Sequence, residues 1–257
     1  MSPRRGANLN IGGRQYTMAQ QVYPPNVVCK IICQHFFRYR GLTLAPRGLA
    51  PGEAPVFDED HAIGDRVISD MEQFHHVRID AVRAAPRGAR DWVVILILGS
   101  EGKYAQHSPD LRKLLEGVEA ERPTKEGRLD EVIVVAEEAF FGKKNLTDVI
   151  REAQQRQAGG DDPAGATPFY NAYPYYKFAL VVPEHCSVAR HRIMAPEEVE
   201  ALFRRGHFVR SDLATIMSND APIIWNGGRE GQVVEIARDS QTAGTALYYR
   251  RIERAAV

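Results

Sequence analysis

The sequence predicts an α+β protein, with an N-terminal unit of α/β layers and a small C-terminal α+β unit that ends in a β-hairpin. Aliphatic runs alternate with amphipathic runs between residues 21 and 157, as strands and helices do in a layered α/β unit. A stretch rich in Gly, Asp and Pro follows at residues 158–168 and breaks this pattern. Two β-patterned runs near residues 233–252 then flank a short polar segment.

Composition narrows the possible functions. The chain of 257 residues can bury a sizeable core without disulfides, and its three cysteines fit a reducing compartment. The 33 basic and 33 acidic residues cancel, so no bulk positive field marks a free-standing nucleic-acid binder. The sequence contains no P-loop, no Rossmann glycine set after a strand and no G-x-S-x-G elbow, and we expect no cofactor.

An amphipathic helix opens the N-terminal unit. It is expected to begin at Pro25 or Asn26 and to end at Gly41. Apolar residues recur three and four positions apart along it, so one face packs against the rest of the protein.

The residues before it show little periodicity, and residues 1–20 are expected to form a flexible arm. Residues 43–55 are interrupted by Pro and Gly and are expected to form a loop.

Three strands and two helices are expected to follow. The strands are VRIDAVRA at 77–84, the run at 91–99 and EVIVVAEEAF at 131–140. The run at 91–99 is nearly all apolar, which predicts a strand buried on both faces. It is also too short to cross a bilayer, so we expect no membrane partner. The helices are expected at 108–120 and at 145–157.

The C-terminal unit is expected at residues 177–257, after an N-terminal domain at 21–157 and a linker at 158–176. The aromatic run at 169–178 contains one basic residue, Lys177, so docking of its rings on a neighbouring domain or subunit is favoured over base stacking. Further expected elements are a strand at 178–182, a helix from Ala195, a short helix at 213–217 and a turn or helix at 220–225.

The closing segment is predicted to be a half-covered hairpin. Val234 and Ile236 share one face of the first strand, and in the second strand Tyr248 and Arg250 alternate with Leu247 and its neighbours. Between the strands, polar side chains can satisfy turn backbone groups and a glycine can take positive φ. The turn residues with these properties are Asp239, Ser240, Thr242 and Gly244.

The stretch WNGGREGQVVEIARDSQTAGTALYYR resembles the closing motif of the fifth common subunit of multisubunit RNA polymerases, a family that includes the archaeal enzymes. The resemblance extends from about Glu184 to Arg251, and for the N-terminal part it is only architectural. Two positions depart from the family pattern: Ala214-Thr215 replace Pro-Arg, and the proline after Asp220 is displaced by one residue. The matching positions are Gly227, Gly231, Val233, Val234, Ile236, Arg238, Ser240, Thr242, Gly244, Tyr249 and Arg250, with Leu213, Ile216 and Asp220 upstream.

The resemblance implies a non-catalytic polymerase subunit, with an assembly domain at its C-terminus. Its N-terminal domain would be a jaw of restriction-endonuclease-like layout beside downstream DNA. The largest polymerase subunit and other subunits are the implied partners, in a host nucleus or cytoplasm or in the virion of a large DNA virus. The family histidine is His191 in the ungapped register or His185 in V-P-E-H. The implied partner-binding residues are His191, Leu213, Ile216, Asp220, Arg238, Ser240, Thr242, Gly244, Tyr249 and Arg250.

Two other classes of function fit parts of the sequence: a metal-dependent nuclease of the PD-(D/E)xK type and a free-standing interaction module. The nuclease would use Asp91 with Glu101 and Lys103, but an intervening strand of eight residues would hold the carboxylates roughly 25 Å apart. Cys29, Cys33 and His35 lie on one predicted helix without a second ligand pair, so core cysteines are favoured over zinc. The acidic run at 58–61 and His75-His76 are interpreted as surface or packing residues rather than as sites.

Overall fold

The structure is a computed structural model of the whole chain, and it has an α+β fold with two mixed sheets. It describes residues 8–11, 14–17, 25–45, 75–84, 90–99, 104, 108–120, 127–141, 144–158, 168–206, 209–240, 242 and 244–255. Glu101, Lys103 and the acidic run at 58–61 therefore lie outside the described residues.

The N-terminal unit is built on a five-stranded sheet of order β3-β4-β5-β6-β7. The strands are β3 (Leu42–Leu44), β4 (His76–Ala84), β5 (Arg90–Leu98), β6 (Gly127–Ala136) and β7 (Phe169–Pro174). β3 to β5 pair antiparallel, whereas β5, β6 and β7 run parallel. The three strands predicted from the sequence are therefore present, and β3 and β7 are additional. The third strand was predicted at 131–140, but it ends at Ala136, and residues 138–140 belong to the short helix α6 (Glu138–Phe141).

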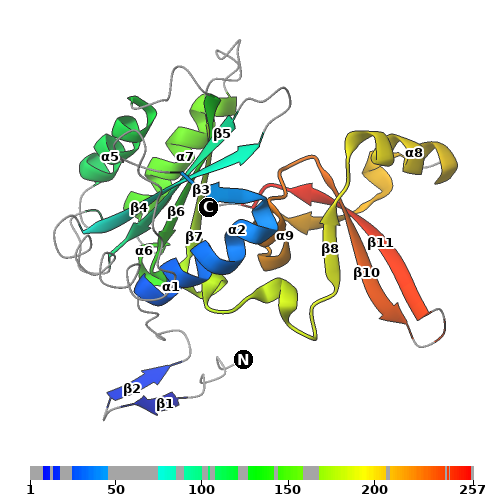
Figure 1. Cartoon of the computed structure of the whole chain (residues 1–257), viewed down its shortest axis with the longest axis horizontal. Helices are drawn as coiled ribbons and strands as arrows, with labels where there is room; N and C mark the ends of the chain where they lie inside the picture. The colour runs from blue at the N-terminus through cyan, green and yellow to red at the C-terminus, as the bar shows by residue number, and fades with distance from the viewer. Residues whose placement is uncertain are drawn as a thin grey trace, which may run out of the picture.

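Helices cover both faces of this sheet (Figure 1). On one face lies the opening helix, and on the other lie α5 (Ser108–Ala120) and α7 (Lys144–Ala158), with the short α6 (Glu138–Phe141) between β6 and α7. Side chains of β5 alternate between the two resulting clusters, with Val93, Ile95 and Ile97 on one side and Val94, Leu96 and Leu98 on the other. The strand is thus buried on both faces, as its continuous apolar sequence predicts.

The opening helix runs from Pro25 to Arg40 as α1 (Pro25–Ile31), the π-helical turn η2 (Ile32–Phe36) and α2 (Phe37–Arg40). It ends at Gly41, which takes the left-handed conformation at φ 60° and so satisfies the last turn of the helix. Both ends of this helix match the sequence-based prediction. Cys29, Cys33 and Cys186 are free thiols.

The linker predicted at 158–176 is wrong for its second half. Residues 169–174 form β7, which pairs parallel with β6, and the 3-10 turn η4 (Tyr175–Phe178) follows directly. Tyr170 packs against the α5–α7 side of the sheet, while Tyr173 and Tyr175 pack against the opening helix. The two faces of this edge strand are thus covered by its own aromatic side chains rather than by an aliphatic run. Because the aliphatic run typical of a buried strand is missing, the sequence of β7 resembles that of a linker.

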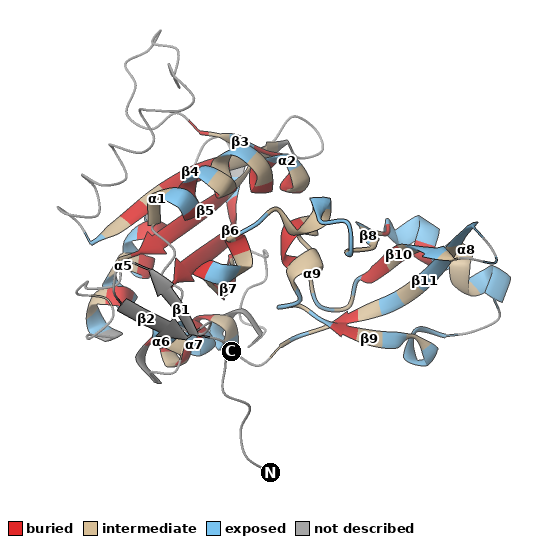
Figure 2. Cartoon of the chain, turned by 90° about the horizontal axis from the view of Figure 1, so that it is seen from below, coloured by how far each residue is buried: buried red, intermediate tan, exposed pale blue. Residues whose placement is uncertain are grey.

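The C-terminal unit is a four-stranded sheet of order β8-β10-β11-β9. Its strands are β8 (Arg190–Ile193), β9 (Ala214–Met217), β10 (Val233–Ser240) and β11 (Gly244–Glu253). Helices α8 (Pro196–Gly206) and α9 (Ala221–Asn226) pack beside it, and the β10–β11 hairpin projects away from the N-terminal unit (Figure 1). Figure 2 shows buried residues concentrated in the five-stranded sheet, whereas β11 is largely exposed.

Two short elements of this unit differ from the prediction. The run at 213–217 was expected to be a helix, but Ala214–Met217 form β9, which pairs parallel with β11 after the 3-10 turn η6 (Arg210–Asp212). The run at 178–182 was expected to be a strand, but it ends η4 and leads into the 3-10 turn η5 (Val182–Glu184). An apolar run of five residues is too short to show whether its apolar residues repeat with the spacing of a helix or of a strand.

The flexible arm expected at 1–20 contains a local strand pair, and its flexibility stays a prediction. Asn8–Ile11 (β1) pair antiparallel with Arg14–Thr17 (β2) as a small sheet of their own. Within the described part of the chain, no helix has both the length and the apolar character needed to cross a bilayer.

Candidate docking surface and interdomain junction

The closing segment forms the predicted hairpin. β10 and β11 pair antiparallel from Val233 opposite Arg251 to Ser240 opposite Gly244. Both strands are central rather than edge strands at their base, because β8 pairs with β10 at residues 234–237 and β9 pairs with β11 at residues 250–253. Among the described residues, the edge of β11 is therefore open only along its distal part, residues 244–249.

The open part of β11 carries two large exposed apolar side chains. Leu247 is 52% exposed and Tyr248 is 51% exposed, and they point to opposite faces of the strand. Arg238 and Arg250 lie on the same face as Tyr248 and are exposed. The distal hairpin thus combines a free backbone edge with tyrosine and arginine, residue types that are enriched in binding hot spots.

Other predicted partner-binding residues belong to the core of the unit. Ile216 is 8% exposed and packs in the cluster of Ile223, Val234, Ile236 and Ile252, which α9 covers. Leu213 and Tyr249 pack on the opposite face of the sheet, against the cluster that contains Val199 of α8. These three residues shape the sheet that presents the hairpin, with Ile216 buried and with Leu213 and Tyr249 partly exposed, and their role in partner binding stays a prediction.

The remaining predicted residues form turns. The Ser240 hydroxyl lies 3.3 Å from that of Thr242, and Gly244 takes φ 71°, so both sides of the tip are fixed locally. Asp220 is exposed and precedes α9, where its carbonyl oxygen accepts hydrogen bonds from two helical N–H groups. The predicted partner-binding residues therefore divide into an exposed hairpin surface, a supporting core and turn positions.

The two candidates for the family histidine lie in different places. His191 is in β8, opposite Ile236 of β10, and its Nδ1 lies 2.6 Å from the Ala189 carbonyl oxygen. His185 is exposed in the turn after η5, where its ring accepts a hydrogen bond from the Ser187 N–H. Only His191 lies in the sheet that contains the hairpin, and its role in partner binding stays a prediction.

The motif also builds a junction between the two units. Trp225 of α9 is completely buried in the cluster formed by the opening helix and η4. Its ring meets those of Phe36, Tyr39 and Phe178 at centroid distances of 5.6, 5.8 and 6.2 Å, and its indole N–H donates to the Lys177 carbonyl oxygen at 3.0 Å. A residue of the C-terminal unit thus completes the core of the N-terminal unit.

A buried ion pair lies beside this tryptophan. Arg40, at the end of the opening helix, pairs with Glu131 of β6, and both side chains are 3% exposed. Arg40 also donates to the Ile224 carbonyl oxygen of α9 at 3.2 Å, and Asn171 of β7 donates to Glu131 at 2.8 Å. Four segments that are distant in the sequence therefore meet at one charge pair.

A second group of charges surrounds Asp130, whose side chain is 2% exposed. Three guanidinium groups contact it: Arg83 at 3.2 Å, Arg128 at 3.3 Å and Arg229, which comes from the turn before β10. Arg229 also stacks on Phe169 of β7, 4.0 Å from the ring centroid. Burial, with the nearby positive charge of Arg40, lowers the pKa of Arg83 from its ordinary value.

Sequence reasoning missed this junction, although a signal was present. Asp130 and Glu131 are two consecutive acids at the start of an otherwise aliphatic strand, where only a charge partner makes burial tolerable. Apart from Arg128, their charge partners are distant in the sequence and come from three other segments, so spacing alone could not identify them. Trp225 and Gly227 were noted as parts of the motif, but their role in joining two cores needs the fold.

The structure gives the nuclease alternative no support in its described part. Asp91, at the start of β5, lies 3.4 Å from Arg128 as an ion pair. No three His, Cys, Asp or Glu side chains of the described residues gather where they could hold a metal ion.

Comparison with known proteins supports the family resemblance. The profile of the RNA polymerase Rpb5 C-terminal domain matches residues 180–252. A DNA-directed RNA polymerase RPB5 homolog of African swine fever virus (isolate Pig/Kenya/KEN-50/1950) is 33% identical over 165 residues, covering 64% of this chain and 75% of that protein. The DNA-directed RNA polymerase subunit Rpo5 of Thermococcus celer is 40% identical over 68 residues, covering 26% of this chain and 83% of the archaeal one.

The fold and these matches define a subunit of the multisubunit RNA polymerase class, and the chain belongs to the RNA polymerase Rpb5 family. The Rpo5 subunit of Nitrosopumilus maritimus, 34% identical over 76 residues, matches 92% of its own length to 30% of this chain. The sequence-based prediction of a non-catalytic subunit of a DNA-directed RNA polymerase is confirmed.

Proposed function

We propose that this subunit docks on the largest polymerase subunit through its C-terminal sheet and positions its N-terminal unit as a jaw near downstream DNA. The open distal edge of β11, with Leu247 and Tyr248 half exposed beside it, is the observation that carries the docking part. An extended partner segment along residues 244–249 would lie end to end with β9 and satisfy that edge. The arginines at 238 and 250 favour an acidic partner surface.

The jaw part rests on the architecture of the N-terminal unit. A mixed sheet with helices on both faces agrees with the restriction-endonuclease-like layout that the resemblance implies. Several cations of α5 and α7 are already paired, including Arg112 with Glu152 and Arg156 with Glu119. Any contact with DNA is therefore local and depends on the rest of the polymerase. The viral relative suggests that this polymerase works inside an infected cell, in the nucleus or cytoplasm, and is packaged in the virion.

Co-purification tests the docking surface directly. We expect the tagged wild-type chain to recover the largest polymerase subunit, and the double variant Leu247→Asp/Tyr248→Ser to recover at least tenfold less, because hot-spot side chains each contribute about 2 kcal/mol or more. Val27→Asp is the matched control, since Val27 is 42% exposed on α1, away from the hairpin. Equal recovery by the hairpin variant and the control would refute docking through this surface.

A further inference from the structure

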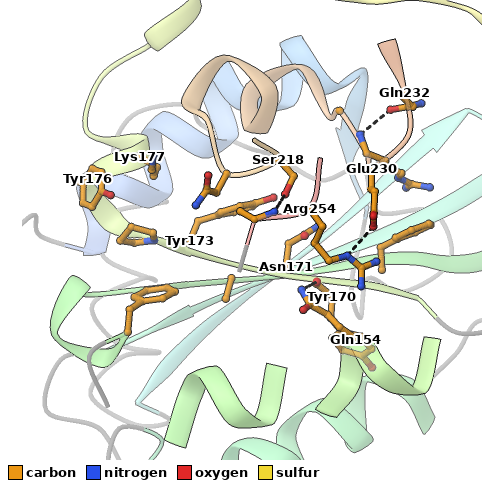
Figure 3. Close-up of a pocket in the computed structure, with 18 of the residues that line it drawn as sticks. Gln154, Tyr170, Asn171, Tyr173, Tyr176, Lys177, Ser218, Glu230, Gln232 and Arg254 are labelled. Carbon is orange, nitrogen blue, oxygen red and sulfur yellow. Dashed lines mark hydrogen bonds and ion pairs between the residues drawn. The ribbon is translucent and has the colours of Figure 1, made fainter. Parts of the chain in front are cut away.

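A groove lies along the free edge of β7, where the two units meet (Figure 3). Its volume is about 630 Å³, within the range of about 300–1,000 Å³ that is typical of ligand sites. One wall is the whole of β7, and the other contains the turn after β9, the turn before β10 and the segment after β11. The residues that line this groove do not include those of the proposed docking surface on the hairpin.

The strand wall offers backbone groups to an occupant. β7 has a partner strand on one side only among the described residues. Pro174 has no N–H, and a strand accepts proline where that missing group faces away from its neighbour. Peptide groups alternate between the two sides of a strand, so the N–H and C=O of Ala172 also point away from β6, toward the groove. On the same outer side, the Tyr170 carbonyl oxygen already accepts a hydrogen bond from the Gln154 side chain at 2.9 Å. An extended chain is the partner that such an edge takes.

The groove is also built to stay open. Arg254 pairs with Glu230 at 2.9 Å, and the Ala255 N–H donates to the Ser218 hydroxyl at 3.0 Å. The Gln232 side chain accepts a hydrogen bond from the Arg229 N–H at 2.7 Å. These bonds fix the opposite wall, so an occupant would not have to order it on binding.

The charges and rings of the groove indicate what kind of segment fits. Tyr176 is 43% exposed, and the Lys177 amine lies 5.3 Å from the centre of its ring, with no carboxylate partner among the described residues. The other groove cations, Arg229 and Arg254, are already paired with acids. The carboxylates of the groove are Glu230, which pairs with Arg254, and Glu138, whose negative charge acts on the Tyr176 hydroxyl. One free amine cannot follow a phosphate backbone, whereas it suits a single carboxylate side chain beside an apolar contact with the Tyr176 ring.

We propose that this groove binds an extended segment of another subunit of the same polymerase, added to β7 as a sixth strand, with an acidic side chain opposite Lys177. The proposal rests on the proposed function, since it needs the chain to be part of the polymerase. It gives the subunit a second contact, on the side of β7 rather than on the hairpin. β7 is about 20 Å long at the usual rise per residue, and the added strand would pair mainly with the outward peptide groups of Ala172 at its centre.

Site-specific photo-crosslinking in the purified polymerase tests it. A benzoylphenylalanine at position 176 is expected to crosslink to one short segment of another subunit, identified by mass spectrometry. The same probe at Lys113, exposed on α5 and not part of the groove, is the control. Lys177→Glu should lower the crosslinking yield at position 176 severalfold, while Lys113→Glu should leave it unchanged.

The outcomes separate this proposal from the docking proposal. Crosslinks from position 176 only to residues of this same chain, or a yield no higher than at position 113, would overturn the groove proposal while the chain still co-purifies with the polymerase. A crosslink to a segment that Lys177→Glu does not weaken would overturn the acidic contact. Failure of the tagged wild-type chain to co-purify with the polymerase would instead count against the proposed function.

Discussion

At the scale of residues, two arginines of one helix differ sharply in their surroundings. Arg40 is buried with Glu131, whereas Arg38, two positions earlier, pairs with Glu184 while 63% of its own side chain is exposed. An exposed pair is screened by water and contributes little, but removing one partner of a buried pair leaves a charge without compensation. Comparing the stability lost on replacing each arginine therefore shows how much the junction depends on its buried charge pair.

We expect Arg40→Met to lower the free energy of unfolding by about 3–5 kcal/mol, and Arg38→Met to leave it almost unchanged. Urea titrations followed by circular dichroism measure both. The double variant Arg40→Met/Glu131→Leu should recover part of the loss, because it removes the stranded carboxylate as well. Equal effects of the two single variants would contradict the role of Arg40.

A carboxylate at the start of α8 gives a prediction about pH. Hydrogen bonds from Nη1 of Arg192 to both carboxylate oxygens, and a second contribution from the Ala195 N–H, lower the pKa of Glu198 from its ordinary value. A lowered carboxyl pKa contributes stability that is present above its unfolded value, about 4.3, and is lost as the pH falls through the folded value. NMR titration should show this midpoint below 4.3, and Glu198→Gln should flatten the acid side of the stability profile. A midpoint at or above the ordinary value would exclude the effect.

At the scale of elements, the same backbone conformation has different costs at two glycines. Gly227 ends α9 and Gly244 opens β11, and both take φ 71°. A Cβ at Gly227 would lie 2.7 Å from Nε of the buried Arg40, whereas a Cβ at Gly244 would meet nothing within 4 Å. Backbone strain is common to both positions, but only the first would also disturb the junction.

Gly244→Ala is therefore expected to cost about 1–2 kcal/mol of stability, from left-handed strain alone. Gly227→Ala should cost about 3 kcal/mol or more, since displacement of the buried arginine is added to that strain. Thermal unfolding of the two variants under one set of conditions makes the comparison. If Gly244→Ala proved the more damaging, the close approach of Gly227 to Arg40 would not matter energetically.

Elements with a long or continuous pattern could be predicted from the sequence, and short ones could not. Helix α5 and strand β5 match their predicted bounds closely, because thirteen amphipathic residues or a run of seven apolar ones leave few alternatives. β9 was predicted as a helix because its identity depends on pairing with β11, 36 positions later at Arg250 opposite Ala214. β7 was missed because its burial comes from rings on both faces of an edge strand.

The candidate site was likewise only partly foreseeable. Its exposed hairpin follows from alternation and turn residues, which are local properties. That β10 and β11 would be flanked at their base by β8 and β9 is a long-range property, and it restricts the free edge to the tip. The residues around Glu131 and Trp225 meet only in the folded chain.

At the scale of the whole molecule, Trp225 links the stability of the two units. Trp225→Ala is expected to cost about 3–5 kcal/mol, because it empties a buried site shared by both. We also expect it to separate their unfolding, so that hydrogen exchange at the amides of β10 becomes faster than at those of β5, whereas in the wild type both exchange together. Phe140→Ala, which empties a site on the α5–α7 side of the sheet, should destabilise the chain without this separation. Parallel loss of protection at β5 and β10 in Trp225→Ala would contradict the linkage.

The order of strands in the C-terminal sheet has a consequence for synthesis. β11 follows the other three strands in sequence, yet it lies between β9 and β10. While the ribosome is still adding residues 244–253, β9 has no neighbour and the sheet cannot close. A nascent chain interrupted there would therefore lack the hairpin through which we propose that the subunit docks, so under that proposal only molecules translated through this strand would join the polymerase.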